Sequence, residues 1–460
     1  MIAKEFKYNG LNGNIIEPTG KLGVMLVGLA GNNGSTFAAS LLAKNHDISW
    51  QTKDGNKRVD FLGSLYQYGT MDTSAGPQLY RDVVPLRTPK QLVVGGWDIT
   101  GENLYESCKK NKVLPPNLCR KLRSHLREIT PLPSIYDPDF VATNQQTRCV
   151  THKTSKSKWQ NIYSIQSDIA GFRVMNELQK VIVVWTASTE RLHTGQWKTA
   201  DELLRAVTNR DPEISPSLQF AIAAVMSGCI FVNGSPQNTI GTALLQLATR
   251  HGGFAVGEDF KTGQTKLKSV LVDFLSSSGI RPLSIVSYNH LGNNDGLNLA
   301  EQKQFESKEN SKRNVISDVV ASNPALFQRR TPEHVVVIKY VAAVGDSKRA
   351  MDEYYSELML DGRSTIALHN TCEDTLLAVP VMLDIILFGD FLSRIEINRS
   401  KLKSDLSLLS FFFKAPVGDN VQNAFFTQLT ALRNFFRICA GQSIPDCIDL
   451  PSRLEKLSYV

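Results

Sequence analysis

The sequence predicts an α/β protein whose mostly parallel sheet is covered by helices on both faces. Two observations predict this fold class: short, continuous apolar runs recur along the chain, and helical patterns separate many of them. Such strands are typical of parallel sheets, because both of their faces are buried. The predicted strands cover residues 22–27, 91–94, 181–185, 269–272, 284–288, 335–339 and 365–369, and the predicted helices cover 116–128, 199–208, 217–231 and 348–360.

The first predicted strand, 22–27, leads into a glycine loop and then into a helix. Gly28, Gly31 and Gly34 stand three apart, and a helical pattern starts at Ser35. A helix start attracts phosphate, and glycines let the backbone approach a pyrophosphate closely. Ala30 occupies the second glycine position of the strict G-x-G-x-x-G pattern. The loop alone therefore leaves two interpretations open, a dinucleotide site and a purely structural turn.

The acidic partner of a dinucleotide's ribose is expected about 20 positions after such a loop. That spacing indicates Asp54, but Asp54 and Gly55 lie between extended runs and favour a type I′ hairpin turn at 53–56. Asp98 follows the strand predicted at 91–94, and nucleotides bind at the carboxyl ends of parallel strands. Asp98 is therefore the preferred candidate.

The uncharged stretch 214–249 is the best candidate for a membrane span. Its apolar centre, 220–232, is too short to cross a bilayer, and the turn residues at 233–236 break it. We expect a buried helix followed by a loop, and no membrane partner.

Three loops combine turn residues with polar groups, and each follows an apolar strand. They cover residues 233–238, 289–296 and 370–375. Each can be read as a turn alone, but three such loops at strand ends indicate one shared site. No histidine spacing in the sequence supports a metal site.

Four lysines are candidates for the chemistry. Lys308 and Lys312 stand four apart at the start of a helix that we expect Ser307 to cap; their mutual repulsion would lower the pKa of one of them, which suits proton transfer. Two solvated surface lysines are the alternative.

Lys348 is expected in the first turn of the helix 348–360, where it opposes the macrodipole and calls for an anionic ligand or an ion pair. Lys414 follows three phenylalanines, where it is either desolvated or extends to water.

Composition and charge narrow the class of protein. The 460 residues predict two or three domains, or one domain with a long insertion. The net charge of +7 comes without a run of five or six basic residues, which argues against nucleic acid but suits a small anionic substrate. Residues 1–8 carry charges where a signal peptide needs an apolar core, and the seven cysteines include no C-x-x-C pair, so we expect a cytoplasmic protein without structural zinc or disulfides.

Eight sequence blocks occur in the order known from one protein family. They cover residues 28–36, 96–99, 184–191, 233–239, 287–296, 344–348, 351–359 and 369–374. With these blocks the chain closely resembles the myo-inositol-1-phosphate synthase family, and the long blocks near 290 and 350 are the most specific. The resemblance implies a Rossmann-like dinucleotide-binding domain, 1–265 plus 377–460, with an inserted α+β catalytic and tetramerisation domain at 266–376. It also implies a homotetramer.

The resemblance implies an NAD-dependent isomerase that converts glucose 6-phosphate to 1D-myo-inositol 3-phosphate, the first step of inositol biosynthesis. In this family the C5 hydroxyl is oxidised, the ketone enolises, the enolate closes the ring onto the C1 aldehyde, and the ketone is reduced again. Two alternatives stay open. One is an NAD-dependent sugar-phosphate dehydrogenase that releases NADH, and the other is a relative that binds NAD without turnover.

The resemblance also implies roles for particular residues. Lys308 and Lys348 would be the principal proton-transfer and oxyanion-stabilising groups, with Lys312 and Lys414 completing the cluster, and Thr262, Gly263 and Gln264 would lie near the substrate phosphate. The family usually has glycine in place of Ala30 and asparagine in place of Ser188, and the extra methyl of Ala30 is expected to weaken NAD binding. The cofactor-binding residues implied are Gly28, Gly31, Asn32, Asn33, Gly34, Asp98, Ser134, Ile135, Gln145, Arg148, Thr186, Ala187, Ser188, Thr189, Gly234, Ser235, Asp259, Asn293, Asn294, Asp295, Gly345, Asp346, Asp374 and Thr375.

Overall fold

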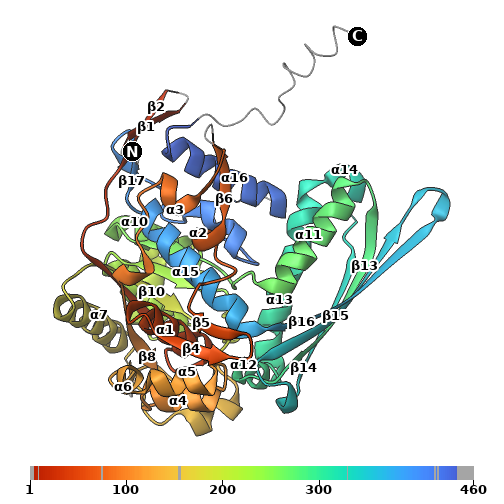
Figure 1. The fold of residues 1–460 in the computed structure, drawn as a ribbon. Helices are drawn as coiled ribbons and strands as arrows, with labels where there is room; N and C mark the ends of the chain where they lie inside the picture. Colours follow the sequence, from red (N-terminus) through yellow and green to blue (C-terminus); the bar gives the residue numbers. More distant parts are fainter. Residues whose placement is uncertain are drawn as a thin grey trace.

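A six-stranded parallel sheet forms the centre of the larger part of the molecule (Figure 1). The computed structural model describes residues 5–442 apart from 9, 74–75, 154–156, 329, 419–420 and 422–423. The strands are, in spatial order, β12 (Phe254–Val256), β11 (Ile230–Asn233), β10 (Leu178–Trp185), β3 (Lys21–Val27), β8 (Leu92–Asp98) and β9 (Leu132–Pro133). The chain passes from β3 to β8 on one side and reaches β10 on the other, so the topological switch point lies at β3.

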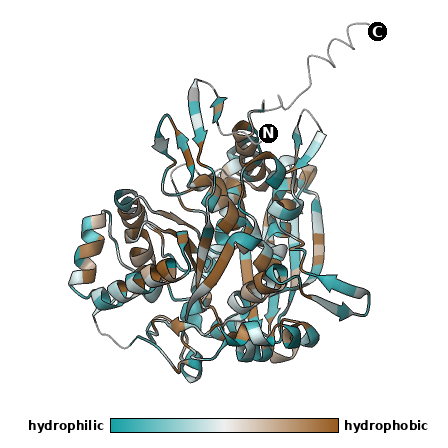
Figure 2. Cartoon of the chain, turned by 60° about the vertical axis from the view of Figure 1, so that its left-hand side comes forward, coloured by the Kyte–Doolittle hydropathy of each residue, from teal (hydrophilic) through white to brown (hydrophobic). Residues whose placement is uncertain are grey.

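Helices cover both faces of this sheet. Successive residues of β3 point to opposite faces, so Leu22, Val24 and Leu26 join one apolar core while Met25 and Val27 join another. In Figure 2 the brown, hydrophobic residues gather on strands and helices in the interior, and the outlying segments carry more teal, hydrophilic residues. Helices of the first core include α1 (Asn32–Asn45), α4 (Leu104–Asn111) and α15 (Asp374–Leu392), and those of the second include α7 (Lys158–Met175), α8 (Ala200–Thr208), α9 (Pro216–Met226) and α10 (Thr242–His251).

A second, four-stranded sheet lies beside the first part (Figure 1). Its order is β14 (Glu333–Tyr340), β13 (Arg281–Leu291), β15 (Ser347–Glu357) and β16 (Arg363–Glu373); β13 and β14 are parallel and the other pairs antiparallel. Helices α11 (Gly263–Ser277) and α13 (Gln302–Ser322) pack on one face through Val272, Ile316 and Val319. On this sheet the side chains of Tyr288, Val335 and Met351 are exposed.

The remaining elements connect or border these two parts. Short strands are β1 (Glu5–Tyr8), β2 (Leu11–Ile15), β4 (Ser49–Thr52), β5 (Gly55–Arg58), β6 (Thr70–Thr73), β7 (Gly76–Leu79), β17 (Ile395–Ile397) and β18 (Ser400–Lys401). The other α-helices are α2 (Leu65–Tyr68), α3 (Tyr80–Val83), α5 (Pro116–Lys121), α6 (Arg123–Arg127), α12 (Asn294–Asn298), α14 (Pro324–Phe327) and α16 (Phe425–Cys439). The 3-10 helices are η1 (Pro89–Gln91), η2 (Thr143–Arg148), η3 (Ala342–Val344), η4 (Met359–Asp361) and η5 (Ser407–Phe412).

Helix α15 is long and apolar enough to cross a membrane, but it packs as a core helix. Of its most apolar window, 89% is buried inside the molecule. The stretch 214–249 was therefore the wrong choice as the best candidate for a span; there the structure has α9, β11 and α10, and α9 is too short to cross.

The structure confirms the α/β fold class and six of the seven predicted strands. The run 269–272 was wrong, because it lies within α11; the helix expected at 348–360 was also wrong, because it is strand β15. The helix 217–231 ends at Met226, and 116–128 is divided into α5 and α6. The hairpin at 53–56 is present as β4 and β5, but Lys53 and Asp54 lack the positive φ of a type I′ turn.

The division into domains at 266–376 stays a prediction. Its two ends fall inside α11 and α15, the helices by which the chain enters and leaves the second sheet. We propose that these two helices belong to the boundary itself.

Candidate active site

A large cleft opens at the carboxyl ends of the parallel strands. Gly28 follows β3, Asp98 ends β8, Trp185 ends β10 and Gly234 follows β11, and all four line the cleft. The opposite wall comes from α12, α13, β15, the start of α15 and the chain around Lys414. The empty space is about 1270 Å³, including the part open to solvent. The three polar loops predicted to share a site therefore all contribute to one cleft.

The glycine loop packs closely against the backbone segments around it. Gly28 has φ 92°, and a Cβ there would lie 2.7 Å from the backbone of Ala187. A Cβ on Gly34 would lie 2.4 Å from the carbonyl oxygen of Gly28, so glycine lets α1 start directly against the loop. The N-cap of α1, Gly31, supplies no side-chain cap, and Asn32 and Asn33 of the first turn line the cleft. The uncapped helix start is thus available to an anion.

The carboxylate of Asp98 is hydrogen-bonded to the glycine loop. This carboxylate accepts from the backbone N–H of Ala30 at 2.9 Å and of Thr100 at 3.2 Å. Burial raises the pKa of Asp98, and Arg148 and the backbone donors partly oppose the rise. Asp54 lies in the β4–β5 hairpin. The structure thus brings Asp98, and not Asp54, to the cleft.

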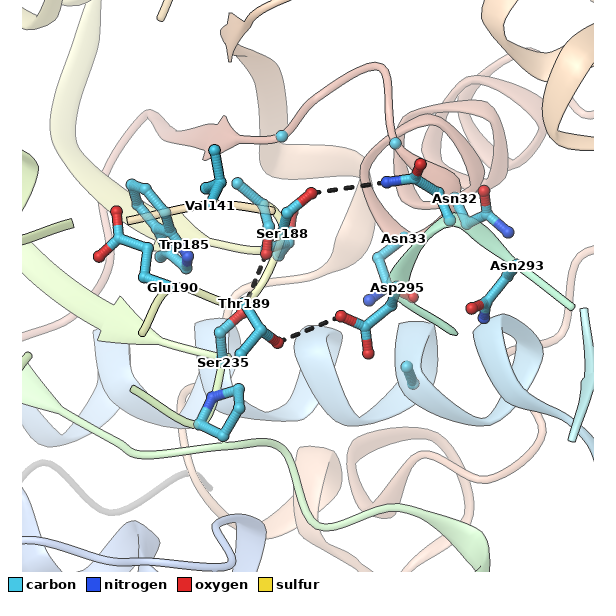
Figure 3. Close-up of a pocket in the computed structure, with 18 of the residues that line it drawn as sticks. Asn32, Asn33, Val141, Trp185, Ser188, Thr189, Glu190, Ser235, Asn293 and Asp295 are labelled. Carbon is cyan, nitrogen blue, oxygen red and sulfur yellow. Dashed lines mark hydrogen bonds between the residues drawn. The ribbon is translucent and has the colours of Figure 1, made fainter. Parts of the chain in front are cut away.

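Gln145 accepts several hydrogen bonds on one wall of the cleft. Its Oε1 accepts from Asn294 Nδ2 at 2.9 Å, from Arg148 Nη1 at 3.1 Å and from Ser188 Oγ at 3.4 Å. Nearby, Thr189 donates to Asp295 at 3.1 Å, a bond drawn in Figure 3. These contacts tie the chain after β10 to the start of α12, so both parts of the molecule form one wall.

Asp259 brings two of the four lysines together. Its Oδ1 accepts from Lys308 Nζ at 3.1 Å and from Lys414 Nζ at 3.0 Å, and its Oδ2 accepts from Ser311 Oγ at 2.6 Å. Lys414 is 4% exposed, so it is desolvated and does not extend to water. Lys308 and Lys312 lie well inside α13, which starts six residues before Lys308, and Ser307 is not the cap.

Lys348 lies on strand β15, not at a helix start. Its Nζ donates to Asp374 Oδ1 at 3.3 Å, so the ion-pair alternative describes it better than the helix-dipole argument. Lys348 lines both the cleft and a small adjoining recess, which we call the lysine recess. The recess is lined by Gln264, Thr265, Lys268, Asn289, Lys312, Val315, Lys348 and Asp352.

Burial and neighbouring charges separate the pKa values of these lysines. Burial lowers the pKa of Lys414 to about 7, with Asp259 opposing. Burial also holds the pKa of Lys312 well below its usual range, and Lys348 and Lys268 add to this effect. For Lys308, burial is outweighed by Asp259, Asp295 and Asp374, so its pKa is raised. The site therefore offers both a persistent ammonium and amines that can exist unprotonated near neutral pH.

The family model for myo-inositol-1-phosphate synthase matches residues 22–437. This chain belongs to the myo-inositol-1-phosphate synthase family. It is 47% identical to inositol-3-phosphate synthase 1-B of Xenopus laevis, over 95% of this chain and 80% of that protein, and 47% identical to inositol-3-phosphate synthase 1 of Homo sapiens, over 95% and 81%. The crystal structure of inositol-3-phosphate synthase from Caenorhabditis elegans matches with a TM-score of 0.91 and 43% identity, covering 96% of this chain and 90% of that one.

NAD is the cofactor of this synthase family, and the cleft fits it. The fit rests on the cradle that a Cβ at Gly28 or Gly34 would fill, and on the uncapped start of α1 beside it. Figure 3 shows Asn32 and Asn33 on one side of the cleft and Trp185 and Glu190 on the other. Among the described residues, no group of three or more His, Cys, Asp or Glu side chains is placed to hold a metal ion.

Most of the residues that the synthase family implies line the cleft. Lys308, Lys348, Lys414 and Thr262 are among them, while Lys312 and Gln264 line the lysine recess. The cofactor candidates that line it are Gly28, Gly31, Asn32, Asn33, Asp98, Ser134, Ile135, Gln145, Arg148, Thr186, Ala187, Ser188, Thr189, Gly234, Ser235, Asp259, Asn293, Asn294, Asp295, Asp374 and Thr375.

Gly34, Gly345 and Asp346 are cofactor candidates outside the lining, and Gly263 lines neither cavity. Asp346 instead supports the lining from behind. It accepts from Asn32 Nδ2 at 3.0 Å and from Thr375 Oγ1 at 2.6 Å, which ties the start of α1 to the start of α15.

Ala30 does not crowd the cleft. Its side chain belongs to the apolar core, and it is not among the lining residues. The expectation that this methyl group weakens NAD binding stays a prediction, and the place of the methyl group in the core argues against it.

Sequence reasoning missed several lining residues. Trp185 could have been found, because it ends a predicted strand at the edge where ligands bind. No pattern in the sequence predicts that Glu190 lines the cleft, because its burial against Ser217 comes from tertiary packing. The other missed residues are Ile99, Tyr136, Val141, Pro216, Phe260 and Ala378 in the cleft, and Thr265, Lys268, Val315 and Asp352 in the recess. Pro236 and Asn289 also line these cavities, and both lie in loops predicted to share the site.

Proposed function

We propose that this chain converts glucose 6-phosphate to 1D-myo-inositol 3-phosphate in the cleft, with the lysines as its proton-transfer and charge-stabilising groups. The single observation that carries the assignment of the site is that the glycine loop and three of the four lysines line one cleft. A cofactor cradle and a cation cluster in one enclosure suit a reaction that oxidises, enolises and reduces the same bound sugar.

The glycine loop and the start of α1 would hold NAD, which would supply the hydride chemistry needed at C5 of the sugar. The other requirements fall on the chain's own residues. The C5 hydroxyl and a C6 carbon must each lose a proton, and an oxyanion forms when the ketone enolises. Lys414, with its pKa lowered to about 7, and Lys312 are the amines able to accept a proton near neutral pH.

Lys308 supplies the fixed positive charge. Asp259, Asp295 and Asp374 raise its pKa, so it stays an ammonium and stabilises the alkoxide or enolate oxygen by hydrogen bonding. Lys348 is paired with Asp374 and lines both the cleft and the recess, which supports a contact with the substrate from this side chain. Fixed donors in a site that excludes water act more strongly than the same groups in solution.

The lysine recess and the start of α11 are the proposed site of the substrate phosphate. The N-cap of α11 is Thr262, which makes no side-chain cap, so the N–H groups of Gly263 and Gln264 in the first turn are open to an anion. Gln264 also donates through Nε2 to the carbonyl oxygen of Lys348 at 3.2 Å, which holds this helix start against β15.

We further propose a homotetramer in the cytoplasm. The exposed apolar side chains of Tyr288, Val335 and Met351 on the second sheet support an interface between subunits. The six cysteines within the described residues are unpaired, which suits a reducing compartment. Sedimentation of the purified protein tests the assembly: a tetramer supports it and a monomer at micromolar concentration contradicts it.

The reaction is tested by incubating the purified protein with glucose 6-phosphate and NAD⁺. The products are followed by ³¹P NMR while absorbance reports NADH. Inositol 3-phosphate without net NADH is expected. A keto sugar phosphate with accumulating NADH indicates the dehydrogenase instead, and NAD binding with no product indicates a relative without turnover.

A further inference from the structure

A fifth lysine, Lys268, lines the lysine recess together with Lys312 and Lys348. It lies on α11, one turn beyond the helix start, and only 6% of its surface is exposed. Lysine is rarely buried without a carboxylate partner, because the desolvated ammonium needs compensation. The contacts of Lys268 therefore indicate the role of this buried charge.

The close partners of Lys268 are neutral. Its Nζ donates to Ser287 Oγ and lies 3.4 Å from Nε2 of His334. Burial and then Lys268 itself lower the pKa of His334 to about 3, so this imidazole is neutral and accepts the bond. The nearest carboxylate oxygen, Oδ2 of Asp352, is 4.0 Å away, and it also accepts from Tyr354 Oη at 3.2 Å.

Lysines predominate in the lining of the recess, which contains three of them and one carboxylate, Asp352. Lys348 is paired with Asp374, so Lys268 is left with Asp352 at 4.0 Å as its nearest carboxylate. Burial lowers the pKa of Lys268, and Asp352 only partly opposes this. An anion in the recess would bring a negative charge closer to the Lys268 ammonium.

We infer that Lys268 is a further substrate-binding residue, which supplies an ammonium to the phosphate group of glucose 6-phosphate within the lysine recess. Ser287 and His334 hold its side chain in place, and the start of α11 supplies backbone N–H groups to the same region. This inference rests on the proposed function, because that function provides the phosphorylated substrate.

Lys266 provides a matched control. It lies on the same helix, two residues away and thus on the opposite side, where its ammonium is 4.9 Å from the ring centre of Phe411. It is half-buried, and burial lowers its pKa too, but it does not line the recess. Lys266→Met removes a charge from α11 at a side chain outside the recess.

The test compares Lys268→Met, Lys268→Gln and Lys266→Met in the NAD-loaded protein. Calorimetric titration with inorganic phosphate and with glucose 6-phosphate measures binding without turnover, and steady-state assays separate KM from kcat. For both Lys268 variants we expect affinity for the two anions to fall about 10- to 100-fold and KM to rise similarly, as for loss of one charge-assisted hydrogen bond. We expect kcat to change little, and Lys266→Met to bind like the parent protein.

Lys268→Gln separates this role from a structural one. Its amide keeps N–H donors for Ser287 but carries no charge, so a merely structural lysine predicts recovery of anion binding by this variant. Normal phosphate affinity in Lys268→Gln, or equal losses in Lys266→Met, would overturn the inference. Failure to form inositol phosphate by the parent protein would instead reject the proposed function, while the binding contrast is still measured.

Discussion

Lys414 donates to Asp259 across 3.0 Å, and the accepting oxygen, Oδ1, also accepts from Lys308 across 3.1 Å. Lys308 comes from α13, whereas Lys414 follows the phenylalanine run near the end of the chain. Both ammonium groups are thus positioned by one buried carboxylate. Burial raises the pKa of Asp259, but Lys308 and Lys414 outweigh it and hold the pKa below its usual range.

Asp259→Asn tests this shared anchor. An amide cannot balance two ammonium groups, and breaking a buried ion pair typically costs about 3–5 kcal/mol. We expect kcat to fall by about 100-fold or more and the melting temperature to drop. Asp201→Asn is the matched control, because it removes an exposed partner of Arg250 at the surface and should change neither quantity. Wild-type kcat in Asp259→Asn would refute the shared anchor.

The pKa of Lys414 predicts a pH dependence. Below about pH 7 the side chain is an ammonium, and above it the free amine is populated and can accept a proton. If Lys414 is the base, kcat/KM rises with pH through about 7 and then levels. Lys414→Arg, which stays charged, should lose about 10²–10⁴-fold in rate and should lack this rise. A rise that persists in Lys414→Arg but disappears in Lys312→Met would assign the proton transfer to Lys312.

Gly34→Ala probes the cradle of the cofactor. The new Cβ would lie 2.4 Å from the carbonyl oxygen of Gly28 and 2.6 Å from that of Leu29, so the loop and α1 must separate. We expect a loss of about 1–3 kcal/mol in stability and weaker NAD binding, measured by thermal unfolding and by titration with NAD⁺. Gly171→Ala, in α7 with nothing within 4 Å of the new Cβ, should keep NAD binding and stabilise the helix by up to about 1 kcal/mol.

Ala30→Gly tests whether the departure from the glycine pattern affects the cofactor. Because the methyl group of Ala30 lies in the core and away from the cleft, its removal should leave the dissociation constant of NAD⁺ unchanged within about twofold. We expect a small loss of stability of about 1 kcal/mol. Tenfold tighter NAD⁺ binding in this variant would show that the methyl group does reach the cofactor.

Local pattern was enough for the parallel sheet and its glycine loop. The run 22–27 is a continuous apolar strand, and the glycines after it allow a backbone approach that a Cβ at Gly34 would block, so both features follow from residue type. Short apolar runs led to wrong predictions where the same run can belong to a helix or to a strand. Ser269–Val272 is apolar enough for a strand but lies in a fifteen-residue helix, because a four-residue run cannot distinguish the two.

The family, the α/β fold class, the glycine loop and the identity of the four lysines follow from residue type and order along the chain. How the lysines work together depends on tertiary contacts. Lys348 lies on β15 because β13 and β16 pair with it on both sides, which outweighs any local helical preference. The sharing of Asp259 by Lys308 and Lys414, and the place of Lys268 in the recess, arise from segments far apart in sequence. Their pKa values follow from burial and from neighbours in space, which no local pattern contains.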